Sequence, residues 1–253
     1  MGRTSNNILS ASQALDAERS FDYIVAYPHS SNIEHNNGQV RARLSALSRM
    51  SIEAANVVQN KYPNSKLILP GETCFEDTGL PDTTDLMVAH LGGDNEHFVP
   101  LHRTADKRPL NNTYLQTIGV LDFLDQLPIT PHNILIETLA YHVKRVRRTA
   151  EAYGLQAQFV AAEDIFAHQN NTEYERLGPV IAKGTRKTEA LAYLLTAGDR
   201  KGTVMNWLMA KAGARIVDVV QDPSGNLVFE NTLAMKKLAR LTEQGLKPFT
   251  AGM

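Results

Sequence analysis

The sequence predicts an α/β protein with a doubly wound, mostly parallel, Rossmann-like sheet and a helical C-terminal extension. Short apolar runs alternate with helix-length stretches over residues 21–161, which is typical of βαβ units. The chain has 253 residues and is 43% hydrophobic, enough for one large core. We divide it into an N-terminal leader (1–20), a Rossmann-like domain (21–165) and a mainly helical extension (166–253) that packs on that domain.

Strands are expected where β-branched and aromatic residues cluster between turn residues, at 21–27, 66–71, 97–101, 133–138 and 156–161. Helices are expected where apolar residues recur every three or four positions, at 41–59, 84–91, 113–127 and 142–153. Asn112 can cap the third of these helices, and Gly154 ends the fourth. A polar loop containing Asn36-Asn37-Gly38 should link the first strand to the first helix.

The two ends of the chain are expected to differ from the domain. The leader should be poorly tied, with a short helix over 10–18. Further helices are expected at 172–181, 187–197, 202–212 and 232–244. Residues 214–220 and 226–229 form either a hairpin or, for the first segment, a further strand of the sheet.

Composition excludes several classes. The 26 basic and 27 acidic residues nearly cancel, which argues against broad nucleic-acid or anionic-membrane binding. Cys74 is the single cysteine, so no intramolecular disulfide or cysteine metal cluster can form. No run approaches the roughly 20 apolar residues of a membrane span, and the leader lacks an apolar signal segment. We therefore expect a cytoplasmic protein.

The polar loops that follow the strands predict a ligand site. Right-handed crossovers bring loops 28–31, 70–77, 103–113 and 139–145 to one sheet edge, where open α/β sheets bind ligands. Each loop leads to a helix N-terminus, which favours an anion. The candidate ligand-binding residues are Ser30, Ser31, Arg41, Arg43, Thr73, Asn112, Thr113 and Arg145. The alternative is that they are ordinary caps and loop residues.

Five residues are candidates for chemistry. His142 and Arg145 lie three apart and therefore share a helix face, which suits an anion with a titratable group beside it. Glu72, like Asp77, could act as a general base or bind a metal, although acidic residues are also common in turns. Glu137 lies inside an apolar strand, where burial would raise its pKa; an exposed strand face is the alternative.

Several known motifs are absent. No G-x-G-x-x-G follows the first strand, and there is no P-loop, no G-x-S-x-G and no H-E-x-x-H. The eight histidines have no metal-binding spacing, so we assign no metal ligand.

Residues 21–165 resemble the YdcF/SanA/ElyC-like family of bacterial proteins with a Rossmann-like domain. Arg41 or Arg43 fits an arginine that opens the family's first helix, Gly71 the first glycine of Ser-Gly-Gly, and Thr113 the threonine of Thr-x-x-Asn. The motif Thr-Ser-x-Tyr-His-x-x-Arg fits Thr138, Tyr141, His142 and Arg145, and Gly154 fits the glycine that closes the helix. Glu72, Gln116 and Leu139 depart from the pattern.

The resemblance adds Gly71 and Thr138 to the ligand-binding residues and implies an S-adenosylmethionine ligand. Our leading hypothesis is a cytoplasmic enzyme acting on a small anionic, phosphate- or nucleotide-bearing molecule. His142, Glu72 and Glu137 are its catalytic candidates. A non-catalytic protein that binds a nucleotide or S-adenosylmethionine is the alternative. A methyltransferase-like use of S-adenosylmethionine is a third, which the missing glycine-rich loop disfavours. The cofactor, a divalent-ion requirement and the oligomeric state stay open.

Overall fold

The protein contains a five-stranded parallel sheet, as a computed structural model shows. The structure describes residues 6–28, 31–36, 39–72, 80–93, 95–110, 112–128, 133–171, 201, 218–221 and 227–230; for 31–36, 39–41, 218–221 and 227–230 it gives the strands alone. The strands are β1 (Tyr23–Ala26), β4 (Lys66–Pro70), β5 (Phe98–Leu101), β6 (Ile134–Thr138) and β7 (Gln158–Ala161). Their order is β5-β4-β1-β6-β7, and all four pairings are parallel. The predicted fold class is confirmed.

Both faces of this sheet are buried, which explains why its strands are apolar runs rather than alternating ones. Successive side chains of a strand point to opposite faces. Thus Ile24 belongs to one core cluster and Val25 to the other, and Leu135 and Ile136 divide in the same way.

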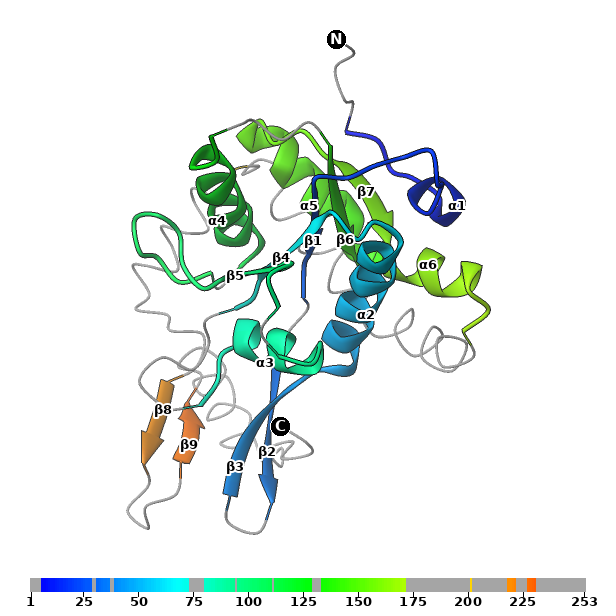
Figure 1. The fold of residues 1–253 in the computed structure, drawn as a ribbon. Coiled ribbons are helices and arrows are strands. Elements are labelled where there is room, and N and C mark those ends of the chain that lie inside the picture. The colour runs from blue at the N-terminus through cyan, green and yellow to red at the C-terminus, as the bar shows by residue number, and fades with distance from the viewer. Residues whose placement is uncertain are drawn as a thin grey trace, which may run out of the picture.

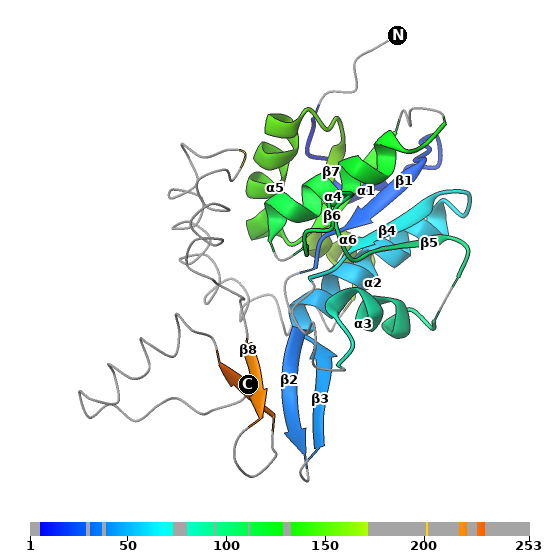
Figure 2. The same ribbon diagram turned by 90° about the vertical axis from the view of Figure 1, so that its left-hand side faces the viewer.

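Helices cover the two faces of the sheet. On one face lie α2 (Ala46–Lys61), α3 (Thr83–His90) and α6 (Ala162–His168), which share a core cluster. On the other face α4 (Thr113–Asp125) packs beside α5 (Ala140–Tyr153), as Figure 2 shows. In Figure 1, α2 and α6 lie on the opposite side of the sheet from α4. The structure is therefore a three-layer α/β/α arrangement.

A β-hairpin stands where the sequence predicted a polar loop and the start of a helix. Strands β2 (Ser31–Asn36) and β3 (Gln39–Leu44) pair antiparallel and project from the carboxyl end of the sheet beside α3 (Figures 1 and 2). Helix α2 begins only at Ala46, because the side chain of Ser45 accepts the amide hydrogen of Ser48 and caps it. The prediction that Arg41 or Arg43 opens this helix is wrong, because both lie on β3.

Part of the leader is tied to the sheet, contrary to expectation. Leu9 donates its amide to Phe159 of β7 at 2.7 Å, and Phe159 donates to Asn7 at 2.9 Å. A short helix α1 (Ala11–Ala14) follows, capped by Ser10. Leu9 and Ala14 are buried in the same cluster as α2 and α6. Backbone pairing and burial together therefore anchor residues 7–14.

The C-terminal region is described only in part. Strands β8 (Asp218–Gln221) and β9 (Leu227–Glu230) form a separate antiparallel pair, so the hairpin alternative is confirmed. The helices expected at 172–181, 187–197, 202–212 and 232–244 lie outside the described residues. Within the described part, no helix combines the length and apolarity needed to cross a membrane.

Candidate functional site

The sheet has one topological switch point, between β1 and β6. The chain runs from β1 outward to β4 and β5, then returns to place β6 and β7 on the other side. The crossover helices change face at that point, and open α/β sheets bind ligands outside the carboxyl ends of the strands at such a point. Tyr27 directly follows β1, and Thr138 ends β6. Both are fully buried.

His142 lies beside this switch point, between two hydroxyl groups. Its Nε2 is 3.1 Å from Thr113 Oγ1, and its Nδ1 is 3.3 Å from Thr138 Oγ1. The imidazole and both threonines are buried. A hydroxyl can donate or accept, so the two contacts suit either neutral tautomer of the ring.

Arg145 completes the cluster as predicted from its spacing. Its Nη1 donates to Thr113 Oγ1 at 2.9 Å, while the side chain stays partly exposed. Thr113 therefore contacts both the imidazole and the guanidinium. We refer to Thr113, Thr138, His142 and Arg145 as the imidazole cluster.

The start of α4 places Thr113 in this cluster. Asn112 caps the helix, since its side chain accepts the amide hydrogen of Leu115 at 3.0 Å, as predicted. One turn later Thr117 donates to the carbonyl of Thr113 at 2.8 Å, and the hydroxyl of Tyr27 lies 3.0 Å from Thr117. Burial raises the pKa of Tyr27 well above its ordinary value, so this hydroxyl keeps its proton and ties β1 to α4.

The start of α5 is held by a carboxylate from another helix. Leu139 occupies the N-cap position without a side-chain hydrogen bond, and Glu163 of α6 accepts the amide hydrogen of Ala140 at 2.7 Å. Burial raises the pKa of Glu163, although its hydrogen bonds act to lower it. Sequence analysis missed this role because Glu163 lies in α6, a helix that was not predicted.

Glu137 is buried on the face of the sheet opposite His142. Its Oε2 is 2.8 Å from the hydroxyl of Ser51 on α2, and it is completely buried. The alternation of β6 places it with Leu135, whereas Thr138 points towards the imidazole cluster. The alternative of an exposed strand face is wrong. The expected direction of the pKa is confirmed: burial raises the pKa of Glu137 well above its ordinary value, and the nearby Glu163 raises it further, against the bond from Ser51.

Gly71 makes a close approach to a helix. A Cβ at this position would lie 2.7 Å from Cα of Thr84, and closer still to its nitrogen and Oγ1. The amide of Gly71 donates to that Oγ1 at 3.0 Å, and the hydroxyl of Thr84 in turn donates to the carbonyl of Leu101 at 2.9 Å. Packing between β4 and α3 therefore accounts for the glycine. A ligand role for it stays a prediction.

The other candidates are not brought to the imidazole cluster by the contacts described. Glu72 is partly buried, and its carbonyl accepts the amide of Thr83 at 3.0 Å. Arg43 is exposed on β3. For Ser31 and Arg41 only the strand is described, and Ser30, Thr73 and Asp77 lie outside the described residues.

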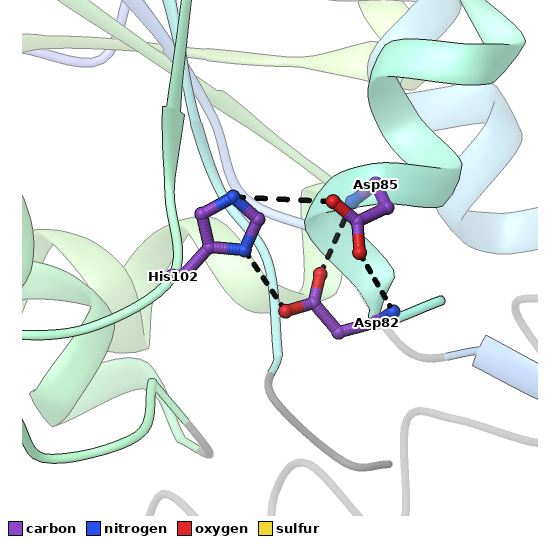
Figure 3. A group of neighbouring side chains, drawn as sticks. All are labelled: Asp82, Asp85 and His102. Atoms are coloured by element: carbon purple, nitrogen blue, oxygen red, sulfur yellow. Dashed lines mark hydrogen bonds and ion pairs between the residues drawn. The ribbon is translucent and has the colours of Figure 1, made fainter. Parts of the chain in front are cut away.

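Within the described part of the chain, one group of side chains could hold a metal ion, and sequence analysis missed it. Asp82, Asp85 and His102, drawn in Figure 3, have ligand atoms that all lie within 4.8 Å of one another. The two aspartates begin α3 as a capping box in which each side chain accepts the other's amide hydrogen at 3.1 Å. The signal was present, because Asp82 opens a helix after β4 and His102 directly follows β5.

The carboxylate oxygens of Asp82 and Asp85 that are not used in the capping box face the imidazole of His102. Asp82 Oδ2 lies 2.9 Å from Nδ1 of His102, and Asp85 Oδ1 lies 3.9 Å from Nε2. The bond to Asp82 raises the pKa of His102. Burial acts to raise the pKa of Asp82, but bonds from His102 and from backbone amides lower it overall. Capping and ion pairing thus account for all three side chains without a metal.

Fold and site together define the class: an α/β protein with a doubly wound, Rossmann-like sheet and a hydroxyl–imidazole–guanidinium cluster at its switch point. Comparison with protein-family models, with curated proteins and with solved structures gives no match for this chain. The resemblance to the YdcF/SanA/ElyC-like family therefore rests on the motif residues alone and stays a prediction.

Proposed function

We propose that this protein is an enzyme acting on a small anionic, phosphate- or nucleotide-bearing molecule at the carboxyl edge of the sheet. The imidazole cluster at the switch point carries the proposal. A buried imidazole is held there by two hydroxyls, and a partly exposed guanidinium contacts one of the same hydroxyls. The amides at the start of α4 add positive potential to that place.

Each member of the cluster has a role in the proposal. Arg145 neutralises the anion and can offer it two parallel hydrogen bonds. Thr113 supplies a neutral donor beside the guanidinium. His142 is the acid–base group, because an imidazole can take or give a proton at its ring nitrogens. Thr138 orients the ring.

Ligand titration by calorimetry tests the proposal. Inorganic phosphate, nucleotides and S-adenosylmethionine are titrated into the wild type and into Arg145→Ala and His142→Ala. Loss of one hydrogen bond to a charged group should weaken binding about tenfold or more. Arg147→Ala is the matched control, since Arg147 lies on the same helix and pairs with Glu151 at 2.8 Å. If Arg145→Ala and His142→Ala alter neither affinity nor turnover for any ligand, the proposal fails.

A non-catalytic ligand-binding protein is the second candidate, and one observation favours it. The hydrogen bonds described for the imidazole of His142 join it to two hydroxyl groups, and its ring stacks with that of Tyr141, while the carboxyl group of Glu137 lies on the other face of the sheet. Binding that is lost in His142→Ala, with the same molecule recovered unchanged after long incubation, would support this candidate over the enzyme.

A further inference from the structure

The side chain of Gln116 on α4 is buried without a hydrogen bond at its nitrogen. Gln116 is 2% exposed, and in the part of the chain that the structure describes its Nε2 has no hydrogen-bond partner. Buried polar groups of native proteins are nearly always paired, so an exception calls for a specific explanation, such as a bound water or ion. An amide nitrogen carries two hydrogens and only donates. The partner that it lacks is therefore an acceptor.

Helix geometry directs this amide towards the start of α4. Gln116 lies three residues after Thr113, so the two share a helix face, and long side chains on a helix lean towards its N-terminus. Thr113 belongs to the imidazole cluster. The next residue on this face, Thr117, is already bonded to the carbonyl of Thr113 and to Tyr27. The amide of Gln116 thus adds a donor beside the turn that places Thr113 in the cluster.

The first turn of α4 supplies further donors. The first amides of a helix have no intrahelical acceptor. Asn112 caps the amide of Leu115 with its side chain, whereas none of the hydrogen bonds described for this turn uses the amides of Thr113 and Tyr114. The dipole of this 13-residue helix gives the same place a positive potential. Backbone amides, a side-chain amide and the guanidinium of Arg145 therefore converge on one region.

This set of donors fits a phosphoryl group better than a carboxylate. A carboxylate presents two oxygens and one negative charge. The terminal phosphoryl group of a monoester presents three strong acceptor oxygens and about −1.5 to −2 charges at neutral pH. A guanidinium can take two of those oxygens side by side, which leaves acceptors for neutral donors that approach from α4.

We infer that Gln116 is a ligand-binding residue whose side-chain amide donates to a terminal phosphoryl group bound by Arg145 and the first amides of α4. The inference rests on the proposed function, because it concerns the same anion site. It narrows the ligand to free phosphate or a phosphate monoester and disfavours a ligand whose only anionic group is a carboxylate, such as S-adenosylmethionine.

Gln116→Met tests the inference, because methionine keeps an unbranched side chain of similar length but removes the amide. Inorganic phosphate, adenosine monophosphate and S-adenosylmethionine are titrated into each protein by calorimetry. Phosphate and adenosine monophosphate should bind Gln116→Met about tenfold more weakly than the wild type, or worse, from the loss of one hydrogen bond to a charged group. Gln59→Met is the matched control: Gln59 is also a buried glutamine, but it lies on α2, on the other face of the sheet.

Thermal unfolding of the free protein separates a ligand-binding amide from a structural one. Gln116→Met removes a buried donor that has no partner, so its Tm should equal or exceed that of the wild type while its affinity for phosphate falls. A Tm several degrees below the wild type, or a variant that does not fold, would show that the amide is bonded within the fold and would overturn the inference.

The titrations also distinguish this inference from the proposed function. If Arg145→Ala weakens phosphate binding and Gln116→Met does not, the role of Gln116 is wrong and the proposed function stands; an ordered water then satisfies the amide. If S-adenosylmethionine binds and the two phosphate ligands do not, the phosphoryl assignment is overturned. If none of the three binds the wild type, both proposals fail.

Discussion

Removal of the Glu163 carboxylate should loosen the start of α5, the helix that carries His142. Because Leu139 provides no side-chain cap, Glu163→Ala leaves the amide of Ala140 without the 2.7 Å bond that now satisfies it. Loss of a cap costs about 0.5–2 kcal/mol, and a hydrogen bond to a charged group contributes about 1.5–3 kcal/mol. These ranges describe the same bond, so we expect about 2 kcal/mol in the free energy of unfolding.

Glu163→Gln is the matched variant, because its amide oxygen can accept the same bond without burying a charge. Urea unfolding at neutral pH should place Glu163→Gln at or above the wild type. Glu163→Ala should fall about 2 kcal/mol below it, a decrease of about 4–8 °C in Tm for a chain of this size. Equal midpoints for Glu163→Ala and the wild type, or an equal loss in both variants, would refute the role assigned to Glu163.

The pH dependence of these variants has a defined sign. The pKa of Glu163 is raised by burial above its ordinary value of 4.5, so the folded protein binds this proton more tightly than the unfolded chain does. The stabilisation from that proton is complete below 4.5 and is lost as pH rises through the folded pKa. Glu163→Gln lacks this loss, and its advantage over the wild type should grow with pH.

Two further predictions concern α3. Gly71→Ala should lower the free energy of unfolding by about 3 kcal/mol, because the new Cβ overlaps the backbone of Thr84; Gly119→Ala, whose Cβ would meet only a side chain, should cost less in the same urea assay. The bond with Asp82 raises the pKa of His102, so its stabilisation is present below 6.5 and is lost as pH rises through the folded value. Asp82→Asn keeps a capping side chain but should flatten this pH dependence, and an unchanged profile would contradict the pairing.

The sequence predicted the sheet because its five strands are apolar runs bounded by turns. It failed at β2 and β3, although Asn37-Gly38 is a strong hairpin signal and 39–44 alternate polar and apolar residues. Leu44 also fits the apolar spacing of the helix that follows, so the predicted helix extended into this strand and the cap at Ser45, which precedes the start of α2 at Ala46, was missed. Helix α6 was missed because it follows β7 without a turn.

Only the part of the site that follows from residue spacing and sheet topology could be predicted from the sequence. Thr113, His142 and Arg145 were brought together correctly, because a helix start and an i, i+3 pair at one sheet edge are set by topology. Glu137 was placed beside His142 by hypothesis. The alternation of β6 shows that it faces away from Thr138, but the sequence does not say which helices cover that face.

The pairing of residues 7–9 with Phe159 also determines whether a strand of another chain can pair with the β7 edge of the sheet. An exposed edge strand is a template for strand addition by another chain. Here the β7 edge is covered by the backbone of Asn7 and Leu9, and the opposite edge, β5, contains Pro100, a residue that an edge strand tolerates only with its nitrogen facing outward. A second copy could not extend this sheet at β7 without displacing the N-terminal segment, so deletion of residues 1–9 should convert a closed edge into an aggregation surface.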